Sequence, residues 1–247
     1  MKRLISVILA AALLFSVAMA EKKERSPEYE IVSNNLFSLT DEELKDIKEL
    51  VDALVANNEL KEKIEKEEQQ KTKEEQLGIW VEKYFVDSFN EPTKDKYIST
   101  KLMIKGTFNN SAATDKELKV KLLISLADDK ETPIVGIELY EYGDNRVNNS
   151  SGTNIANYSL YVRKEDGGTK YFSCYIPKKA SRIYIDEEYA NFGFGTRKDF
   201  VEILKTNKTV KFRMTNDSNY TNSSYAFQID DTTGFDYAYQ WLLSDEE

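Results

Sequence analysis

Few side chains in this sequence are of a type that could perform acid–base or nucleophilic chemistry. None of its 247 residues is a histidine, which excludes Ser-His and Cys-His nucleophile pairs and His-ligated metal sites. The single cysteine, Cys174, alternates with Phe172 and Ile176 along a predicted strand, a pattern typical of a buried, unreactive thiol. One cysteine also allows no intramolecular disulfide. We therefore expect no histidine- or cysteine-dependent catalysis.

Paired carboxylates are the remaining side chains that could act as general acid and general base. A glycosidase places two carboxyl groups roughly 5 to 10 Å apart across a sugar, and a calcium loop needs an Asp-x-Asp-x-Asp-Gly spacing that this chain lacks. Acidic residues at strand ends usually form solvated turns, so we predict no catalytic residue, no metal site and no cofactor. The candidate acidic runs are Asp128-Asp129, Asp186-Glu187-Glu188 and Asp230-Asp231.

Tyrosine is the residue type that departs most from an ordinary β-protein. If the apolar positions of the predicted strands face inward, a set of aromatic residues faces outward together with Glu138 and Arg182. Such a face could bind carbohydrate by ring stacking, or a protein through large, stiff contacts. Alternatively, the tyrosines pack across neighbouring strands or lie under the N-terminal arm. The candidate binding residues are Tyr140, Tyr142, Tyr161, Arg163, Tyr171, Tyr175 and Tyr184.

The elements that must position these side chains are mostly strands. Residues 98–108 and 118–126 alternate between apolar and polar, as half-buried strands do, and residues 79–89 are apolar on both faces, as in a central strand. Parallel sheets need crossover helices, which are scarce here. We therefore predict a mainly β fold, an antiparallel β-sandwich of about nine strands. Two short inserted helices are predicted to cover an open end: residues 197–204, with Thr196 as the N-cap, and residues 235–243.

The segment before the predicted sandwich forms a charged helical arm. Thr40 and Glu43 have the spacing of a capping box, and an interruption is predicted at Asn57-Asn58. The arm folds back on the β-domain, binds a partner, or pairs with a second copy to form a homodimer through residues 41–66. The apolar residues at helical spacing are Leu44, Ile47, Leu50, Val51, Leu54 and Val55.

The first twenty residues have the form of a secretion signal. Two basic residues precede an apolar run over 4–17, and small residues flank Met19 ahead of Glu21. The run is shorter than the roughly 20 residues that span a bilayer, and a lipoprotein would need cysteine after the cleavage site. We predict cleavage after Ala20, an extracytoplasmic protein that is periplasmic or secreted, and no transmembrane segment after cleavage.

One stretch of the chain also resembles other proteins. It contains Trp80-x-x-x-Tyr84-x-Val86-Asp87-x-Phe89-x-x-Pro92-Thr93 and then Gly106-x-Phe108-x-Asn110-Ser111-Ala112. Over residues 80–142 the chain resembles a set of uncharacterised secreted proteins of anaerobic and host-associated bacteria. The resemblance implies an extracytoplasmic β-domain without an assigned activity. The motifs themselves predict a turn at Pro92-Thr93 and a strand that ends near Asn110.

Charge and organisation together predict a class of function. The formal net charge of −9 disfavours nucleic acid as a partner, because phosphate binding depends on clustered lysine and arginine. We expect a non-catalytic binding module of the bacterial envelope that contacts a protein or glycan through the tyrosine-rich face or the arm. The alternatives are a carboxylate-dependent glycan-active enzyme and a self-associating structural envelope protein. The predicted segments are a signal peptide (1–20), a charged leader and helical arm (21–76) and the β-sandwich (77–247).

Overall fold

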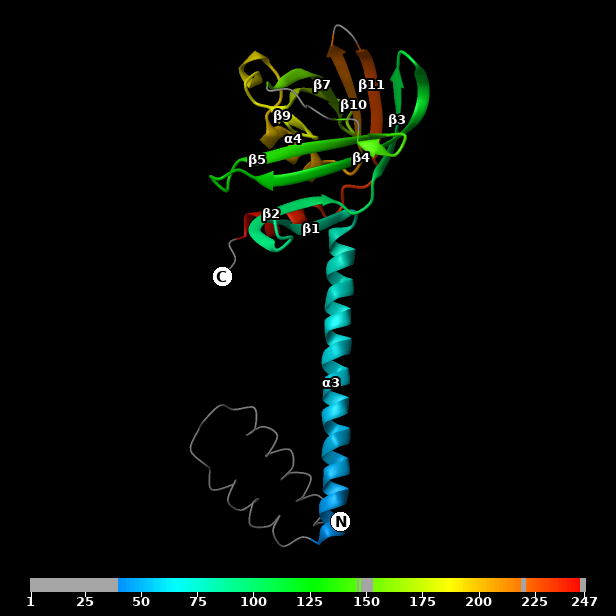
Figure 1. Cartoon of the computed structure of the whole chain (residues 1–247), viewed down its shortest axis with the longest axis vertical. Coiled ribbons are helices and arrows are strands. Elements are labelled where there is room, and N and C mark those ends of the chain that lie inside the picture. The colour runs from blue at the N-terminus through cyan, green and yellow to red at the C-terminus, as the bar shows by residue number, and fades with distance from the viewer. Residues whose placement is uncertain (1–39, 146, 148–152, 219–220, 245–247) are drawn as a thin grey trace. The chain divides into compact units, whose positions relative to one another are not determined.

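The computed structural model describes residues 40–145, 147, 153–218 and 221–244 (Figure 1). The chain divides into two compact units, Met1–Lys71 and Thr72–Glu247. The predicted signal peptide and its cleavage site lie outside the described residues. All the strands reported below belong to the second unit.

Helix α3 (Asp41–Leu77) is 37 residues long. The predicted capping box at its start is confirmed: the Glu43 N–H donates to Thr40 Oγ1 at 3.3 Å, and the Thr40 N–H donates to Glu43 Oε2 at 2.9 Å. The predicted interruption at Asn57-Asn58 is wrong, because the helix continues through both residues; asparagine weakens a helix far less than glycine or proline does. Within the described part of the chain, no helix has an apolar stretch long enough to cross a membrane.

The described residues contain eleven strands joined in one antiparallel sheet. Their bounds are β1 (Trp80–Val86), β2 (Pro92–Thr100), β3 (Ile104–Asn110), β4 (Ala113–Leu126), β5 (Pro133–Glu141), β6 (Asp144–Asn145), β7 (Ile155–Arg163), β8 (Thr169–Ile176), β9 (Ile183–Asp186), β10 (Val210–Ser218) and β11 (Thr221–Ile229).

The sheet closes on itself, so the predicted β-sandwich is wrong. Eight strands follow one another in the order β4-β3-β11-β10-β7-β8-β9-β5, and β5 pairs again with β4 over Leu118–Leu126 of β4. The protein is therefore an eight-stranded antiparallel barrel with β1, β2 and β6 as additional strands (Figure 1). Strands in a sandwich and in a small filled barrel share the same alternation of inward and outward residues, so the pattern alone does not separate the two folds.

Strand β4 is the element that joins the barrel to the β1–β2 hairpin. It is 14 residues long. Its first part pairs with β3, from Ala113 to Val120, and its later part pairs with β2, from Leu123 to Ser125. The hairpin therefore lies beside β3 along the same edge of β4, which creates a second surface next to the barrel wall.

Three details of the hairpin region correct the sequence interpretation. Residues 79–89 were expected to form a central strand, but β1 pairs only with β2 among the described strands; its second apolar face packs on a helix instead. Residues 98–108 form two strands rather than one. The turn expected at Pro92-Thr93 lies earlier, where Asp87 Oδ1 accepts the N–H groups of Phe89 and Glu91. The predicted strand end at Asn110 is confirmed.

Apolar side chains fill the barrel. Leu118, Val120, Leu122 and Ile124 of β4 are fully buried, while Lys119 between them is exposed. The predicted half-buried strand over 118–126 is therefore confirmed, and its inward residues face a core to which every strand of the barrel contributes.

Helix α4 (Arg197–Thr206) packs against the core of the barrel. Its Phe200 ring lies 5.7 Å from Phe172 of β8 and 6.0 Å from Phe212 of β10, measured between centroids. The predicted cap is present: the Asp199 N–H donates to Thr196 Oγ1, and the Thr196 N–H donates to the Asp199 carboxylate. This helix seals part of the barrel core, so the lid expected from the sequence covers a barrel rather than a sandwich.

Helix α5 (Phe235–Leu243) has the bounds predicted from the sequence. It packs on β1, where the Phe235 ring lies 4.8 Å from Trp80 and the Trp241 ring lies 5.5 Å from Tyr84. This contact covers the face of the β1–β2 hairpin that carries Trp80 and Tyr84. A short 3₁₀ helix, η1 (Ala190–Phe192), precedes α4.

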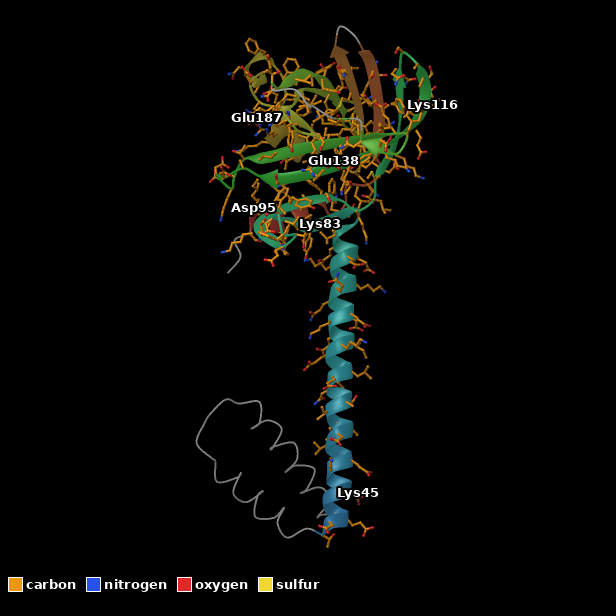
Figure 2. The ribbon with its side chains drawn as sticks, in the orientation of Figure 1. Lys45, Lys83, Asp95, Lys116, Glu138 and Glu187 are labelled. Atoms are coloured by element: carbon orange, nitrogen blue, oxygen red, sulfur yellow. The ribbon has the colours of Figure 1, made fainter. Side chains whose placement is uncertain are left out.

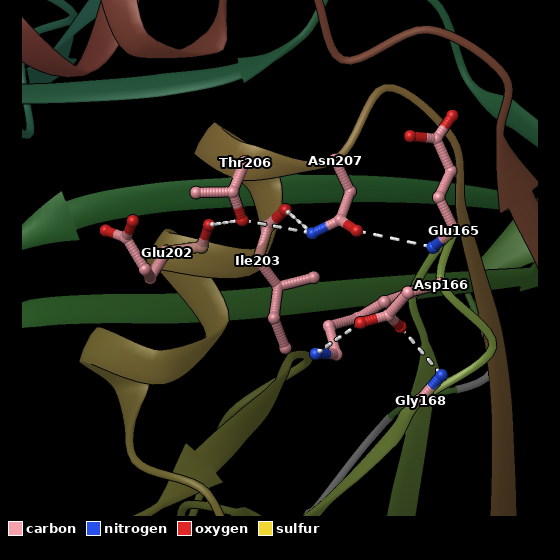
Figure 3. Close-up of polar contacts among 8 residues, drawn as sticks. Glu165, Asp166, Gly168, Glu202, Ile203, Thr206 and Asn207 are labelled. Carbon is pink, nitrogen blue, oxygen red and sulfur yellow. Dashed lines mark hydrogen bonds and ion pairs between the residues drawn. The ribbon is translucent and has the colours of Figure 1, made fainter.

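Asn207 ties the end of α4 to the β7–β8 turn (Figure 3). Its buried amide Nδ2 donates to the Ile203 carbonyl at 2.9 Å, and its Oδ1 accepts the Glu165 N–H at 3.3 Å. In the same turn, Asp166 Oδ1 accepts the Gly168 N–H at 2.7 Å. The Ile203 carbonyl also accepts the Asn207 N–H at 3.2 Å, so the side chain adds a second bond at the helix end and links it to the turn amide.

Candidate functional site

A groove with a volume of about 890 Å³ lies on the outer face of the sheet, beside the β1–β2 hairpin, β4, β5 and β9. The sheet register explains which residues reach it. Tyr97 lies opposite Ser125, and Gly136 lies opposite both Leu123 and Tyr184. Because residues opposite one another present their side chains on the same face, four neighbouring strands contribute to one hollow.

Small and apolar residues make the floor of the groove. Gly136 of β5 has no side chain and lies opposite Leu123 of β4, and Ser125 of β4 lies opposite Ile134 of β5. A Cβ at position 136 would lie 3.5 Å from Tyr184 Cε1 and 3.9 Å from Leu123 Cβ, both ordinary contact distances. The backbone at this position therefore tolerates a side chain, and the glycine serves to keep the floor low.

Aromatic rings border the floor on two sides. On the β1–β2 hairpin, Phe85 and Tyr97 have their ring centroids 4.6 Å apart. On the barrel, Tyr184 of β9 lies opposite Tyr175 of β8, with centroids 6.2 Å apart. Such rings offer an apolar surface to a ligand, and the tyrosines add a hydroxyl at the edge.

A buried carboxylate holds Arg182 at the border of the groove. The Arg182 Nε donates to Glu138 Oε1 at 2.6 Å, and the Tyr140 hydroxyl donates to Glu138 Oε2 at 2.8 Å. Glu138 lies on β5 (Figure 2) and is only 7% exposed. Burial, followed by the hydrogen bond to Glu138, raises the pKa of Tyr140, so the phenol remains a donor at neutral pH. Arg182 also interacts with the Tyr184 side chain, which connects the network to the aromatic border.

Charged side chains and the C-terminal end of α5 complete the lining of the groove. Lys94, Lys96 and Lys130 line it together with Asp95 and Asp128; Asp95 is labelled in Figure 2. The Lys96 Nζ donates to the Ser244 carbonyl at 2.9 Å and lies 5.0 Å from the Trp241 ring centroid. This lysine is therefore positioned by the end of α5.

Some of the predicted binding residues gather near this groove. Tyr184 lines it, Tyr175 packs beside Tyr184, and Tyr140 belongs to the Glu138–Arg182 network. These three residues are on β8, β9 and β5, which are consecutive in the barrel.

The other predicted binding residues lie elsewhere. Tyr161 and Tyr171 pack on each other across β7 and β8 with ring centroids 4.9 Å apart, and Arg163 is exposed at the end of β7. Tyr142 is 62% exposed and packs edge-on against Phe108 at 5.3 Å. The outward tyrosines thus fall into several groups, of which one adjoins a groove.

Sequence reasoning missed the hairpin side of the groove. Phe85, Tyr97 and Lys94 come from β1 and β2, whose register against β4 depends on contacts between distant parts of the chain. Gly136 was the one available signal, because a glycine inside a strand often marks a close approach or a binding surface.

The acidic runs serve turns in the structure. Asp129 Oδ1 accepts the N–H groups of Glu131 and Thr132, and hydrogen bonds from Thr132 and Glu131 lower the pKa of Asp129 to about 2. Asp231 and Asp186 likewise accept a backbone N–H two residues further on. In the part of the chain that the structure describes, no three acidic or cysteine side chains are grouped as metal ligands would be.

Two further titratable groups are buried in the barrel. Cys174 is 1% exposed, as its strand pattern predicted, and burial raises the pKa of its thiol. The Tyr225 hydroxyl donates to Glu141 Oε1 at 2.9 Å. Burial and the nearby Glu141 charge raise the pKa of Tyr225, so this phenol stays protonated and acts as a donor inside the barrel.

Comparison of the chain with protein-family models, curated proteins and solved structures gives no match.

Proposed function

We propose that residues 77–247 form a non-catalytic binding module and that the outer groove is its contact surface. The observation that carries this proposal is the low floor at Gly136 between two aromatic borders. A volume of about 890 Å³ falls in the range of roughly 300 to 1,000 Å³ that is usual for small-ligand sites. The form of the first twenty residues supports a module that acts outside the cytoplasm.

The arrangement of acidic groups favours binding over glycan hydrolysis. Hydrolysis needs two carboxyl groups across the scissile bond. The carboxylates that line the groove are Asp128, from one of the three acidic runs, and Asp95 of β2, and both lie at its charged rim. The carboxylates of Asp129, Asp186 and Asp231 bind turn amides. Glu138 is engaged by Arg182 and Tyr140. These pairings leave the groove with side chains suited to holding a ligand.

The experiment blocks the groove with a large side chain introduced at its floor. Gly136→Trp places a large side chain between the aromatic borders, whereas Gly136→Ala adds only a Cβ at ordinary contact distances. The matched control is Ala226→Trp, on the exposed face of β11, three strands away round the barrel. The mature protein and the three variants are compared on a glycan array and, for each bound glycan, by calorimetry, after thermal melts have verified folding.

The proposal predicts that Gly136→Trp loses binding while Gly136→Ala and Ala226→Trp retain it. Equal binding by all four folded proteins would show that the contact surface lies elsewhere. Release of reducing ends from a bound glycan would instead support the glycan-active enzyme.

A further inference from the structure

At the floor of the groove, Gly136 is bordered by an aromatic ring and by the side chain of an arginine. A Cβ placed on this glycine would lie 3.5 Å from Tyr184 Cε1 and 3.7 Å from Arg182 Cδ. The bare backbone of Gly136 therefore gives one ligand group access to the ring and to the arginine together. An amphipathic group suits this place, because an aromatic ring packs on apolar C–H groups while a guanidinium donates hydrogen bonds.

The charge of Arg182 is already balanced by a buried carboxylate. The Arg182 Nε donates to Glu138 Oε1 at 2.6 Å, and the Tyr140 hydroxyl donates to the other carboxylate oxygen. Glu138 is 7% exposed (Figure 2), so water screens its charge weakly. An anionic ligand group beside Arg182 would be repelled by Glu138, and a cationic group would be repelled by the guanidinium. This pair of charges therefore favours an uncharged ligand.

Arg182 is also suited to hydrogen bonding with such a ligand. Glu138 engages the Nε–H, and the terminal nitrogens of the guanidinium carry further N–H groups. The interaction of Arg182 with the Tyr184 side chain keeps the guanidinium beside the ring. A planar guanidinium held in this way donates hydrogen bonds in fixed directions. A sugar has the matching groups, because it combines an apolar C–H face with hydroxyl groups round its edge.

Two other classes of uncharged ligand fit this place less well. An extended peptide gains its affinity by adding a strand at a free sheet edge, whereas the floor strands β9, β5, β4 and β2 are each paired with their neighbour in the floor. A compact apolar molecule needs a site that encloses most of its surface, whereas this groove lies on the outer face of the sheet and has charged side chains at its rim.

We propose that the groove binds an uncharged oligosaccharide, with one sugar ring over Gly136 against the Tyr184 ring and with sugar hydroxyl groups that accept hydrogen bonds from Arg182. This inference rests on the proposed function, because it names the class of ligand for the same groove.

The test compares uncharged chains with charged chains of the same length. The mature protein is titrated by calorimetry with the neutral hexasaccharides cellohexaose, chitohexaose and mannohexaose, with the acidic hexagalacturonate, and with the basic hexamer of glucosamine. N-phenyl-1-naphthylamine, followed by its fluorescence, is the apolar probe.

The variants separate the ring from the guanidinium. Tyr184→Ala removes the ring beside Gly136, and Arg182→Lys keeps a positive charge opposite Glu138 but loses the planar set of donors. The matched control is Tyr171→Ala, because Tyr171 is a 50% exposed tyrosine of β8 that does not line the groove. Thermal melts verify that each variant folds.

We expect at least one neutral hexasaccharide to bind about tenfold or more tightly than both charged chains. Its affinity should change by less than about twofold between about 0.05 and 0.5 M salt, because the ligand carries no charge to be screened. Tyr184→Ala and Arg182→Lys should each weaken this binding about fivefold or more, and Tyr171→Ala should stay within about twofold.

Three results would overturn the inference. A charged hexamer that binds as tightly as the best neutral one would show that the groove does not select uncharged chains. Wild-type affinity in both Tyr184→Ala and Arg182→Lys would place the sugar elsewhere. Absence of binding by all the neutral hexasaccharides also rejects this ligand class.

The binding function is judged separately with Gly136→Trp. If the apolar probe or a charged hexamer binds the wild type but not Gly136→Trp, the groove is a binding site for a different class of ligand, and only the inference fails. If Gly136→Trp retains every interaction of the wild type, the proposed function fails as well.

Discussion

Truncation of Phe200 tests whether α4 is part of the barrel core. Phe200 is 1% exposed and packs on the rings of Phe172 and Phe212. Replacement of a buried phenylalanine by alanine costs about 3 to 5 kcal/mol, because the lost transfer free energy is added to that of the cavity. The two ring neighbours lie on strands paired on both sides, which limits collapse into the cavity. We therefore expect a loss near the middle of that range, about 4 kcal/mol.

The assay is urea denaturation followed by tryptophan fluorescence. The chain has two tryptophans, Trp80 in the core and Trp241 on α5, so the signal reports on the second unit. Phe192→Ala is the matched control, since this phenylalanine is 78% exposed and its removal should change the free energy of unfolding by less than about 0.5 kcal/mol. Equal unfolding midpoints for Phe200→Ala and Phe192→Ala would refute the placement of α4 against the barrel core.

Three further predictions concern buried polar and titratable groups. Asn207→Ala leaves the Glu165 N–H without its acceptor and removes one of two hydrogen bonds to the Ile203 carbonyl, which keeps the backbone N–H of residue 207. It should cost about 1 to 2 kcal/mol in the same urea assay; a change below about 0.5 kcal/mol would contradict the role of this side chain. Folded Tyr225 has a raised pKa, so above pH of about 10 the unfolded state loses this proton first and the free energy of unfolding should fall as pH rises. Tyr225→Phe should flatten that fall, and an unchanged slope would count against the buried hydrogen bond to Glu141. Cys174 should react with a thiol-specific dye only in urea; rapid labelling of the native protein would show that the barrel opens.

Local signals in the sequence were sufficient for the elements with short-range causes. The caps at Thr40 and Thr196 depend on a hydroxyl and a carboxylate three residues apart. The bounds of α5 follow from an apolar run after Gly234, and the burial of Cys174 follows from alternation along one strand. Each of these features depends on interactions between residues that are close in the sequence, so the local sequence is enough to predict it.

The groove and the barrel depend on pairings between distant residues. Alternation states which side chains of β4 face inward, but not that the strand pairs with β5 on one side and with both β3 and β2 on the other. That pairing closes the barrel and places Tyr97 and Tyr184 on one outer face. Alternation within a strand does not predict it, because alternation does not determine which strands pair or in which register.

The sequence by itself determined the excluded chemistries, the mainly β composition and the start of each capped helix. Only the tertiary structure decided that the sheet closes, that β1 lies at its edge, and that Gly136 forms the floor of a groove rather than a weak point in a strand. The physical reason is that side-chain type and spacing fix local conformation and the inward face. Closure and site geometry arise from register between strands far apart in the chain, which is selected by the packing of the whole core.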